Sequence, residues 1–154
     1  MKLTQLLTEK LIRIGLSRSD KRGIVEELVG ILVSAGKVRD GEKLVDATME
    51  REAKGSTGLA RGIAVPHCKI DGINELICSM AISREGIDFD SLDGTPSHIF
   101  IFLAAPTGMS GPHVKALSNI ATLSQSDEFL RKLREASTTH EALRIITKEE
   151  ARLD

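Results

Sequence analysis

Apolar residues between positions 20 and 35 recur with the spacing of a helix. Those that share one side are Ile24, Val25, Leu28, Val29, Leu32 and Val33. A repeat of three to four residues presents one apolar face to a core, so the stretch is predicted to be helical. Ser17 or Ser19 is expected to cap its start and Gly36 to end it. A second helix is predicted over residues 40–54.

Short apolar runs without helical spacing predict the strands. The clearest are residues 76–83 and 98–105, and the second is almost entirely apolar. Such a run is typical of a strand that is covered on both faces. Shorter strands are expected at residues 11–16 and 62–65, and the turn-rich segment 86–96 separates the two long strands.

After the last strand the pattern becomes helical again. A helix is expected to begin near His113, and its apolar side would carry Val114, Leu117, Ile120 and Ala121. Two further helices are predicted over residues 127–135 and 139–147, with Ser126 and Thr138 as caps. Helices on both sides of central strands indicate a three-layer α/β sandwich. No repeat or linker divides the 154 residues, so a single domain, 1–154, is expected.

Composition excludes several classes of function. The net charge is −1, so no basic field attracts nucleic acid or an anionic membrane. Only four Phe and no Trp or Tyr are present, which removes the stacking platforms used for single-stranded nucleic acid. No apolar stretch approaches the ~20 residues that cross a bilayer, and charges interrupt the N-terminus. We therefore expect no nucleic-acid partner and a cytoplasmic location.

The cysteines and histidines do not form a recognisable metal or disulfide pattern. The two cysteines make no CxxC pair, and no HExxH or Cys₂His₂ spacing occurs. Cys78 lies within a predicted strand and is expected to be a small core residue. Among the histidines, His98 is expected to be structural and His140 solvated.

His67 is the residue best placed for chemistry. A short strand ending in Pro66 presents it, and the preceding run Gly55-Ser-Thr-Gly58 supplies glycine and hydroxyl groups that suit an anion. Imidazole ionises near neutral pH, so His67 is a candidate acid, base, nucleophile or ligand. The alternative is a core histidine satisfied by one hydrogen bond. Cys68 should point to the opposite face of the strand, which argues against a Cys–His dyad.

Arg51 and Glu52 lie on the apolar side of their predicted helix. A charged pair that faces a core needs partners, because unpaired burial of charge is costly. One interpretation is that Arg51 reaches solvent or pairs with Glu52. The other is that it points into a cleft and binds an anion with two hydrogen bonds.

His113 follows Ser110 and Pro112 and would lie in the first turn of its helix. Backbone N–H groups there are unpaired and favour an anion. The helix dipole would also lower the pKa of His113 and keep it neutral, as a hydrogen-bond donor. The alternative is an ordinary surface histidine at a helix start.

Several of these motifs, in this order, resemble a known family. Glu50-Arg-Glu52, Gly55-Ser-Thr-Gly58 and Gly62-Ile-Ala-Val-Pro-His67 are similar to the type-2 enzyme IIA domain of the bacterial sugar phosphotransferase system. This is the fructose–mannitol family, which includes a nitrogen-regulatory branch. The likeness extends over residues 3–148, which would form the core of the domain, and it implies a mixed central sheet between helices.

The resemblance assigns a role to each candidate residue. His67 takes the place of the phosphorylated histidine, Arg51 that of the phosphate-stabilising arginine, and His113 that of the second active-site histidine. Ser56 and Thr57 would be further donors to the phosphate. Phosphate would pass through a covalent phosphohistidine, without metal or cofactor.

The resemblance also implies partners. The phosphocarrier protein HPr would be the donor and a IIB domain or subunit the acceptor, so the chain would meet a membrane transporter only through IIB and IIC. The expected function is a phosphocarrier in sugar uptake. Alternatives are a nitrogen-type regulatory phosphoprotein and, in a different class, an interaction module that is not phosphorylated. No IIB, IIC or HPr-like segment is apparent in the sequence, which is compatible with both the phosphocarrier and the regulatory phosphoprotein.

One position departs from the family pattern. The family commonly has glycine after the active histidine, and this chain has Cys68. A side chain there would be expected to narrow the approach of a partner or to expose a thiol to oxidation.

Overall fold

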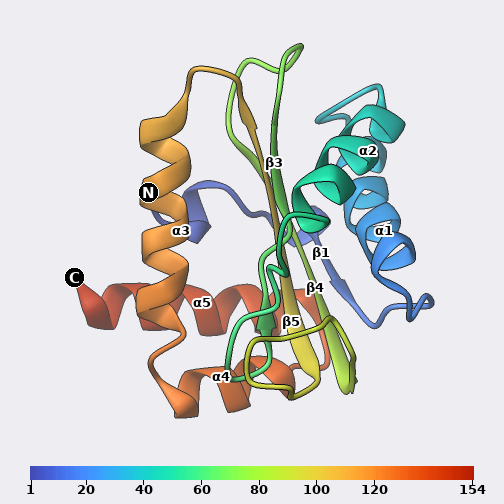
Figure 1. The fold of residues 1–154 in the computed structure, drawn as a ribbon. Coiled ribbons are helices and arrows are strands. Elements are labelled where there is room, and N and C mark those ends of the chain that lie inside the picture. The colour runs from blue at the N-terminus through green and yellow to red at the C-terminus, as the bar shows by residue number, and fades with distance from the viewer.

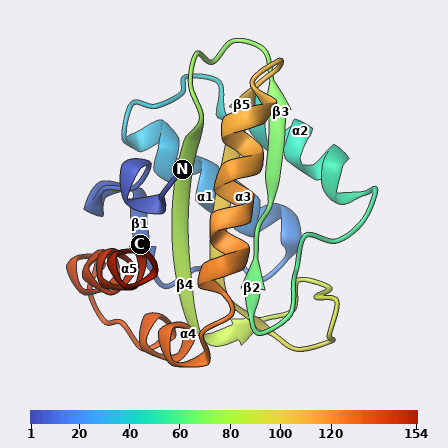
Figure 2. The same cartoon turned by 90° about the vertical axis from the view of Figure 1, so that its left-hand side faces the viewer.

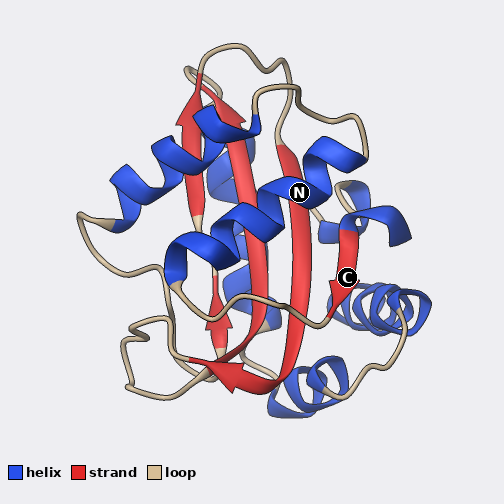
Figure 3. Cartoon of the chain, turned by 90° about the vertical axis from the view of Figure 1, so that its right-hand side faces the viewer, coloured by secondary structure: helices blue, strands red, loops and turns tan.

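The computed structural model describes residues 1–154 as a five-stranded mixed sheet with helices on both faces (Figure 1). The strands are β1 (Ile12–Ile14), β2 (Ile63–Ala64), β3 (His67–Ile70), β4 (Ile77–Ile87) and β5 (Ser97–Pro106). One face is covered by α1 (Lys21–Ser34) and α2 (Gly41–Glu52), as Figure 3 shows. The other carries α3 (Ser110–Leu123), α4 (Asp127–Arg134) and α5 (Thr139–Leu153). The predicted three-layer α/β sandwich is confirmed.

The sheet order is β1-β4-β5-β2, and β3 also pairs with β5 (Figure 2). β4 and β5 are antiparallel, whereas β1, β2 and β3 run parallel to their neighbours. Because β2 and β3 both pair with β5, they form a single edge of the sheet, interrupted at Val65 and Pro66. β5 lies inside the sheet, and its residues Ile99 to Ala105 are buried, as its apolar sequence predicts. None of the helices has both the length and the apolarity to cross a membrane.

Helix ends mostly follow the predicted signals. Ser126 and Thr138 cap α4 and α5 as expected, each accepting a backbone N–H. The expected cap of α1 was wrong: Asp20 accepts the N–H of Gly23, whereas the hydroxyl of Ser17 donates to Glu27. Two short 3₁₀ turns (Leu3–Gln5 and Glu9–Leu11) precede β1. α5 continues beyond the predicted residue 147 to Leu153.

The buried side of α3 also differs from the prediction. Val114 is 62% exposed, and Ala121 is exposed as well. The helix begins at Ser110, before the predicted start, and its buried residues are His113, Ala116, Ile120 and Leu123. Of the predicted side, Ile120 is confirmed and Leu117 is partly buried against the core. The predicted side left out His113, although this imidazole lies on the side that packs against the sheet, and it included Val114 and Ala121, which face away from the core.

Buried Glu150 joins the two ends of the chain. It accepts hydrogen bonds from the backbone N–H groups of Leu3 (2.7 Å) and Thr4 (3.1 Å) and from the hydroxyl of Thr4 (2.7 Å). The amide of Asn119 on α3 donates to it as well, at 2.8 Å. A carboxylate can accept all these bonds, because its two oxygens offer about four lone-pair sites.

We expect Glu150→Gln to lower the free energy of unfolding by about 2 kcal/mol, because one oxygen becomes an NH₂ group facing donors. Urea unfolding measures the change. Glu128→Gln is the control, since Glu128 is 70% exposed in its pair with Lys132 and such pairs contribute about 0.5 kcal/mol or less. Equal effects of the two substitutions would contradict the role given to Glu150.

Candidate functional site

His67 is the first residue of β3, at the open edge of the sheet. Its Nδ1 lies 2.8 Å from the carbonyl oxygen of Val65. A carbonyl only accepts, so Nδ1 carries the proton and donates it. Nε2 is then the unprotonated nitrogen, with a free lone pair. The break at Pro66 allows the ring to reach back to the carbonyl two residues earlier, and this contact defines the tautomer.

His113 faces His67 from α3. The two ring centroids lie 5.3 Å apart, with the planes at 79°. His113 is only 3% exposed, and its Nε2 has no hydrogen-bond partner in the protein. A buried polar atom without a protein partner is rare and costly, so this nitrogen stands out as one able to bond a group that reaches His67. His113 is therefore not the surface histidine that the sequence left as an alternative.

The electrostatics keep both imidazoles neutral at pH 7. Burial lowers the pKa of His67, and the charges of Arg51 and Lys69 add to this, although the bond to Val65 acts in the opposite direction. Burial also lowers the pKa of His113 to about 4, with smaller contributions from His67 and Lys69. The sequence attributed this lowering to the helix dipole, whereas the main cause is the loss of solvent around the ring.

The lowered pKa of His113 predicts a pH-dependent stability. Below about pH 6.5 the unfolded histidine binds a proton, whereas the folded one stays neutral down to about pH 4. The contribution of neutral His113 to the free energy of unfolding is therefore fully present above pH 6.5. It is lost as the pH falls toward 4. Urea unfolding should show a loss of about 2 kcal/mol between pH 7 and pH 5 from this group. His113→Gln should remove that share of the pH dependence; an unchanged dependence would contradict the assignment.

Arg51 lies in the last turn of α2, half-buried. It does not pair with Glu52; its Nη1 donates to the carbonyl oxygen of Gly55 at 2.9 Å. Glu52 pairs with Lys21 instead, and Arg51 takes part in none of the ion pairs of the structure. The charge of Arg51 lowers the pKa of His67. Several guanidinium N–H groups therefore remain available to an anion beside the imidazole.

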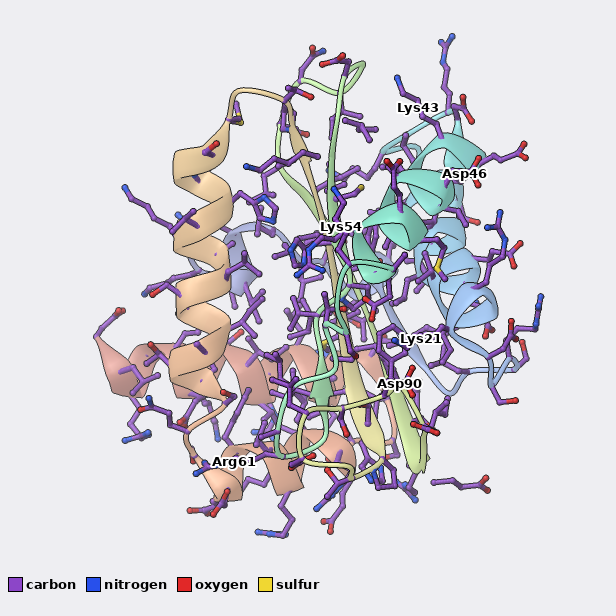
Figure 4. The ribbon with its side chains drawn as sticks, viewed as in Figure 1. Lys21, Lys43, Asp46, Lys54, Arg61 and Asp90 are labelled. Atoms are coloured by element: carbon purple, nitrogen blue, oxygen red, sulfur yellow. The ribbon has the colours of Figure 1, made fainter.

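Glu52 anchors the segment that carries Arg51. It is 6% exposed and accepts hydrogen bonds from Lys21 (2.8 Å) and from both the N–H (3.0 Å) and the hydroxyl of Thr57. Burial alone would raise the pKa of Glu52, but the bonds from Lys21 and Thr57 bring it below its ordinary value. Lys21 also lies 3.2 Å from Asp90, and Figure 4 shows these two side chains close together. The Lys21 ammonium lies 4.9 Å from the ring centroid of Phe89.

The partner of Glu52 could not be found from sequence. Lys21 lies on another helix. The sequence indicated only that Glu52, a carboxylate on the apolar side of α2, needs a partner. The network connects the ends of two helices to the loop before β2, so it holds the backbone that presents Arg51. We regard Lys21 and Glu52 as positioning residues.

The hydroxyls of Ser56 and Thr57 both donate within the protein. Thr57 donates to Glu52, and Ser56 donates to the carbonyl oxygen of Phe89 at 2.9 Å. Ser56 also accepts the N–H of Gly58 at 3.0 Å. In this arrangement they hold the loop, and the geometry offers no free hydroxyl proton to an anion. Their part in phosphate binding stays a prediction.

The side chain of Cys68 does not border the His67 site, although the residue directly follows His67 in the sequence. It is 4% exposed and lies beside Thr48 of α2, on the face of β3 opposite His67. Burial raises the pKa of its thiol. The expectation that it narrows a partner's approach or exposes a thiol was therefore wrong, since alternation along the strand turns the side chain into the core. Cys78 is also buried, at 1% exposure, as predicted.

The remaining histidines lie away from this site. His98 donates from Nδ1 to the carbonyl oxygen of Ser83 at 3.0 Å, a structural contact as predicted. His140 is exposed, with Nδ1 3.3 Å from a carboxylate oxygen of Glu9.

The fold and site define an α/β protein with a neutral histidine pair and an unpaired arginine at one edge of its sheet. Residues 5–149 match the family described as "Phosphoenolpyruvate-dependent sugar phosphotransferase system, EIIA 2", and the chain belongs to this family. It is therefore an EIIA protein with a role in phosphoryl transfer, as the sequence predicted.

Relatives in this family include both transport and regulatory proteins. The chain is 35% identical over 146 residues to the fructose-specific EIIABC component of Bacillus subtilis; the match covers 95% of this chain but 23% of that protein. The crystal structure of the nitrogen regulatory protein IIA-Ntr from Neisseria meningitidis superposes with a TM-score of 0.86, at 25% identity. The match covers 94% of this chain and 98% of that one. A matching chain in the complex of IIA-mannitol with phosphorylated IIB-mannitol from Escherichia coli shares the fold, with a TM-score of 0.75 and 19% identity. The match covers 92% of this chain and 97% of that one.

Proposed function

We propose that the chain carries a phosphoryl group on Nε2 of His67, which it receives from a phosphohistidine of HPr and passes to a IIB partner. The observation that carries the proposal is the pair of nitrogens left without partners. Nε2 of His67 has a free lone pair because Nδ1 is held by Val65, and Nε2 of buried His113 has no hydrogen bond.

In the transfer step the lone pair of His67 Nε2 forms the new N–P bond. The P–N bond of the donor breaks, and its electron pair returns to the donor's imidazole nitrogen. His67 keeps its Nδ1 proton, so the phosphorylated ring gains positive charge, which the carbonyl of Val65 stabilises. Onward transfer to IIB reverses these changes and restores the neutral imidazole.

Arg51 and His113 would stabilise the charge on the phosphoryl oxygens. Arg51 supplies a permanent cation, and neutral His113 donates one hydrogen bond from a protonated Nε2. Little covalent chemistry is left to the protein in phosphoryl transfer, so positioning and charge neutralisation supply most of the rate. The proposal requires no metal and no cofactor.

The proposed partners follow from the family. Two similar proteins support a IIB domain as the acceptor, since one is a fructose-specific EIIABC component and the other is solved as a complex of IIA with phosphorylated IIB. Contact with a membrane transporter would be made only through IIB and IIC, which is consistent with a cytoplasmic chain that binds no nucleic acid.

A regulatory phosphoprotein is the second candidate. The likeness to a nitrogen regulatory protein, with a TM-score of 0.86, favours it. The same phosphohistidine would serve both functions, so the distinction lies in where the phosphoryl group goes.

The test is a reconstituted phosphoryl relay. With phosphoenolpyruvate, enzyme I and HPr, the chain should gain a phosphoryl adduct that is labile in acid and stable in base. Adding a IIB domain should discharge it if the chain serves uptake, whereas an adduct that persists with every IIB tested favours regulation. Absence of an adduct with both sugar-type and nitrogen-type carriers would exclude phosphoryl transfer.

A further inference from the structure

Lys69 lies two residues after His67 on β3. Alternate residues of a strand point to the same face, so both side chains project from the face that α3 covers. The ammonium of Lys69 donates to the hydroxyl of Ser110, at 3.3 Å, in the first turn of α3. Its side chain therefore spans from the strand of His67 to the helix of His113.

No carboxylate neutralises the Lys69 ammonium, because its only polar contact is the Ser110 hydroxyl. The N-terminal end of a helix already carries partial positive charge and disfavours a cation. Arg51, on the α2 side of His67, is likewise without a carboxylate. Unpaired positive charges around buried His113 and half-buried His67 repel one another, and an anion between them would offset this repulsion.

Lys69, on the strand of His67 and bonded to the helix of His113, also affects both rings electrostatically. Its charge lowers the pKa of His67 and also that of His113. Arg51 acts only on His67. Lys69 is therefore the cation that acts on both histidines. A phosphoryl group on Nε2 of His67 would lie between the two rings.

We propose that Lys69 is a second cation of the phosphoryl site and binds a phosphoryl oxygen on His67. An ammonium has three N–H donors, so it can keep its bond to Ser110 and donate another to the phosphoryl group. Ser110 then positions the ammonium before the phosphoryl group arrives. This inference rests on the proposed phosphorylation of His67.

The test compares Lys69→Gln with Lys115→Gln. Lys115 lies two residues after His113 and is exposed, so its replacement removes the same charge from the neighbouring element. At saturating phospho-HPr, Lys69→Gln should slow phosphorylation by about 10-fold or more, because one charge-stabilising donor is lost. Lys69→Arg should recover most of the rate, and Lys115→Gln should match the wild type.

A second measurement separates direct contact from partner docking. In ³¹P NMR of the phosphorylated protein, Lys69→Gln should raise the second pKa of the phosphoryl group by about half a unit, since a nearby cation favours the dianion. A ¹H titration should also show higher pKa values for both His67 and His113. Lys115→Gln should leave all three unchanged.

Two outcomes would overturn the proposal. One is a Lys69→Gln protein with the rate and phosphoryl pKa of Lys115→Gln. The other is a Lys69→Gln protein with a raised KM for phospho-HPr but an unchanged phosphoryl pKa, which would make Lys69 a docking residue. Failure of the proposed function looks different, because the wild type would then take up no phosphoryl group at all.

Discussion

Replacing His67 by glutamine is expected to abolish phosphorylation by phospho-HPr, with a fall in rate of at least about 1000-fold. Glutamine has a similar size and retains an N–H that can donate to Val65. It lacks the free imidazole lone pair, so no N–P bond can form. Transfer of ³²P from labelled phosphoenolpyruvate, followed by gel autoradiography under alkaline conditions, measures the effect.

The other exposed or half-buried histidines provide the controls. His98→Gln and His140→Gln should be phosphorylated at the wild-type rate, because both lie outside the site. A His67→Gln protein that still forms an acid-labile adduct would show that the phosphoryl group resides on another residue, and His113 would then be the first to examine.

Replacing Arg51 by methionine is expected to slow the transfer step by about 100-fold or more. Methionine retains much of the apolar stem but removes the cation that has no carboxylate partner. Arg51→Lys should recover only part of the rate, because an ammonium cannot reproduce the two parallel N–H bonds of a guanidinium. Single-turnover mixing with phospho-HPr separates this step from binding.

Arg39→Met is the matched control for Arg51. Arg39 is exposed and lies before the opposite end of α2, so its replacement should leave the transfer rate unchanged. If Arg51→Met weakens binding of phospho-HPr while the single-turnover rate stays at the wild-type value, Arg51 contacts the partner and not the transferred group.

Much of the fold was predictable from sequence because its signals are local. Helical spacing predicted α1 and α2, and the apolar run predicted β5. The candidates His67 and Arg51 were also apparent, since a proline exit and a charge on an apolar helix side can be identified over a few neighbouring residues. Their roles came from the resemblance to the EIIA family, not from spacing alone.

Other features required knowledge of how distant segments pack. His113 was predicted as a candidate, but its burial and its unpaired Nε2 depend on α3 lying across β3. The partnership of Glu52 with Lys21 and the reach of Lys69 to Ser110 each join two separate elements. That Cys68 points away from His67 was predictable from alternation along a strand, but its burial beside Thr48 depends on α2 packing against β3.

The sequence by itself determined most of the helices and strands, although not the short strand β3 or the ends of α3 and α5. It also determined which side chains are able to take part in chemistry, because both follow from local spacing and residue type. Only the tertiary structure decided which of those side chains face one another. Contacts between residues far apart in the chain depend on strand register and helix packing, and no short stretch of sequence specifies these. The histidine pair and the two cations beside it are products of that packing.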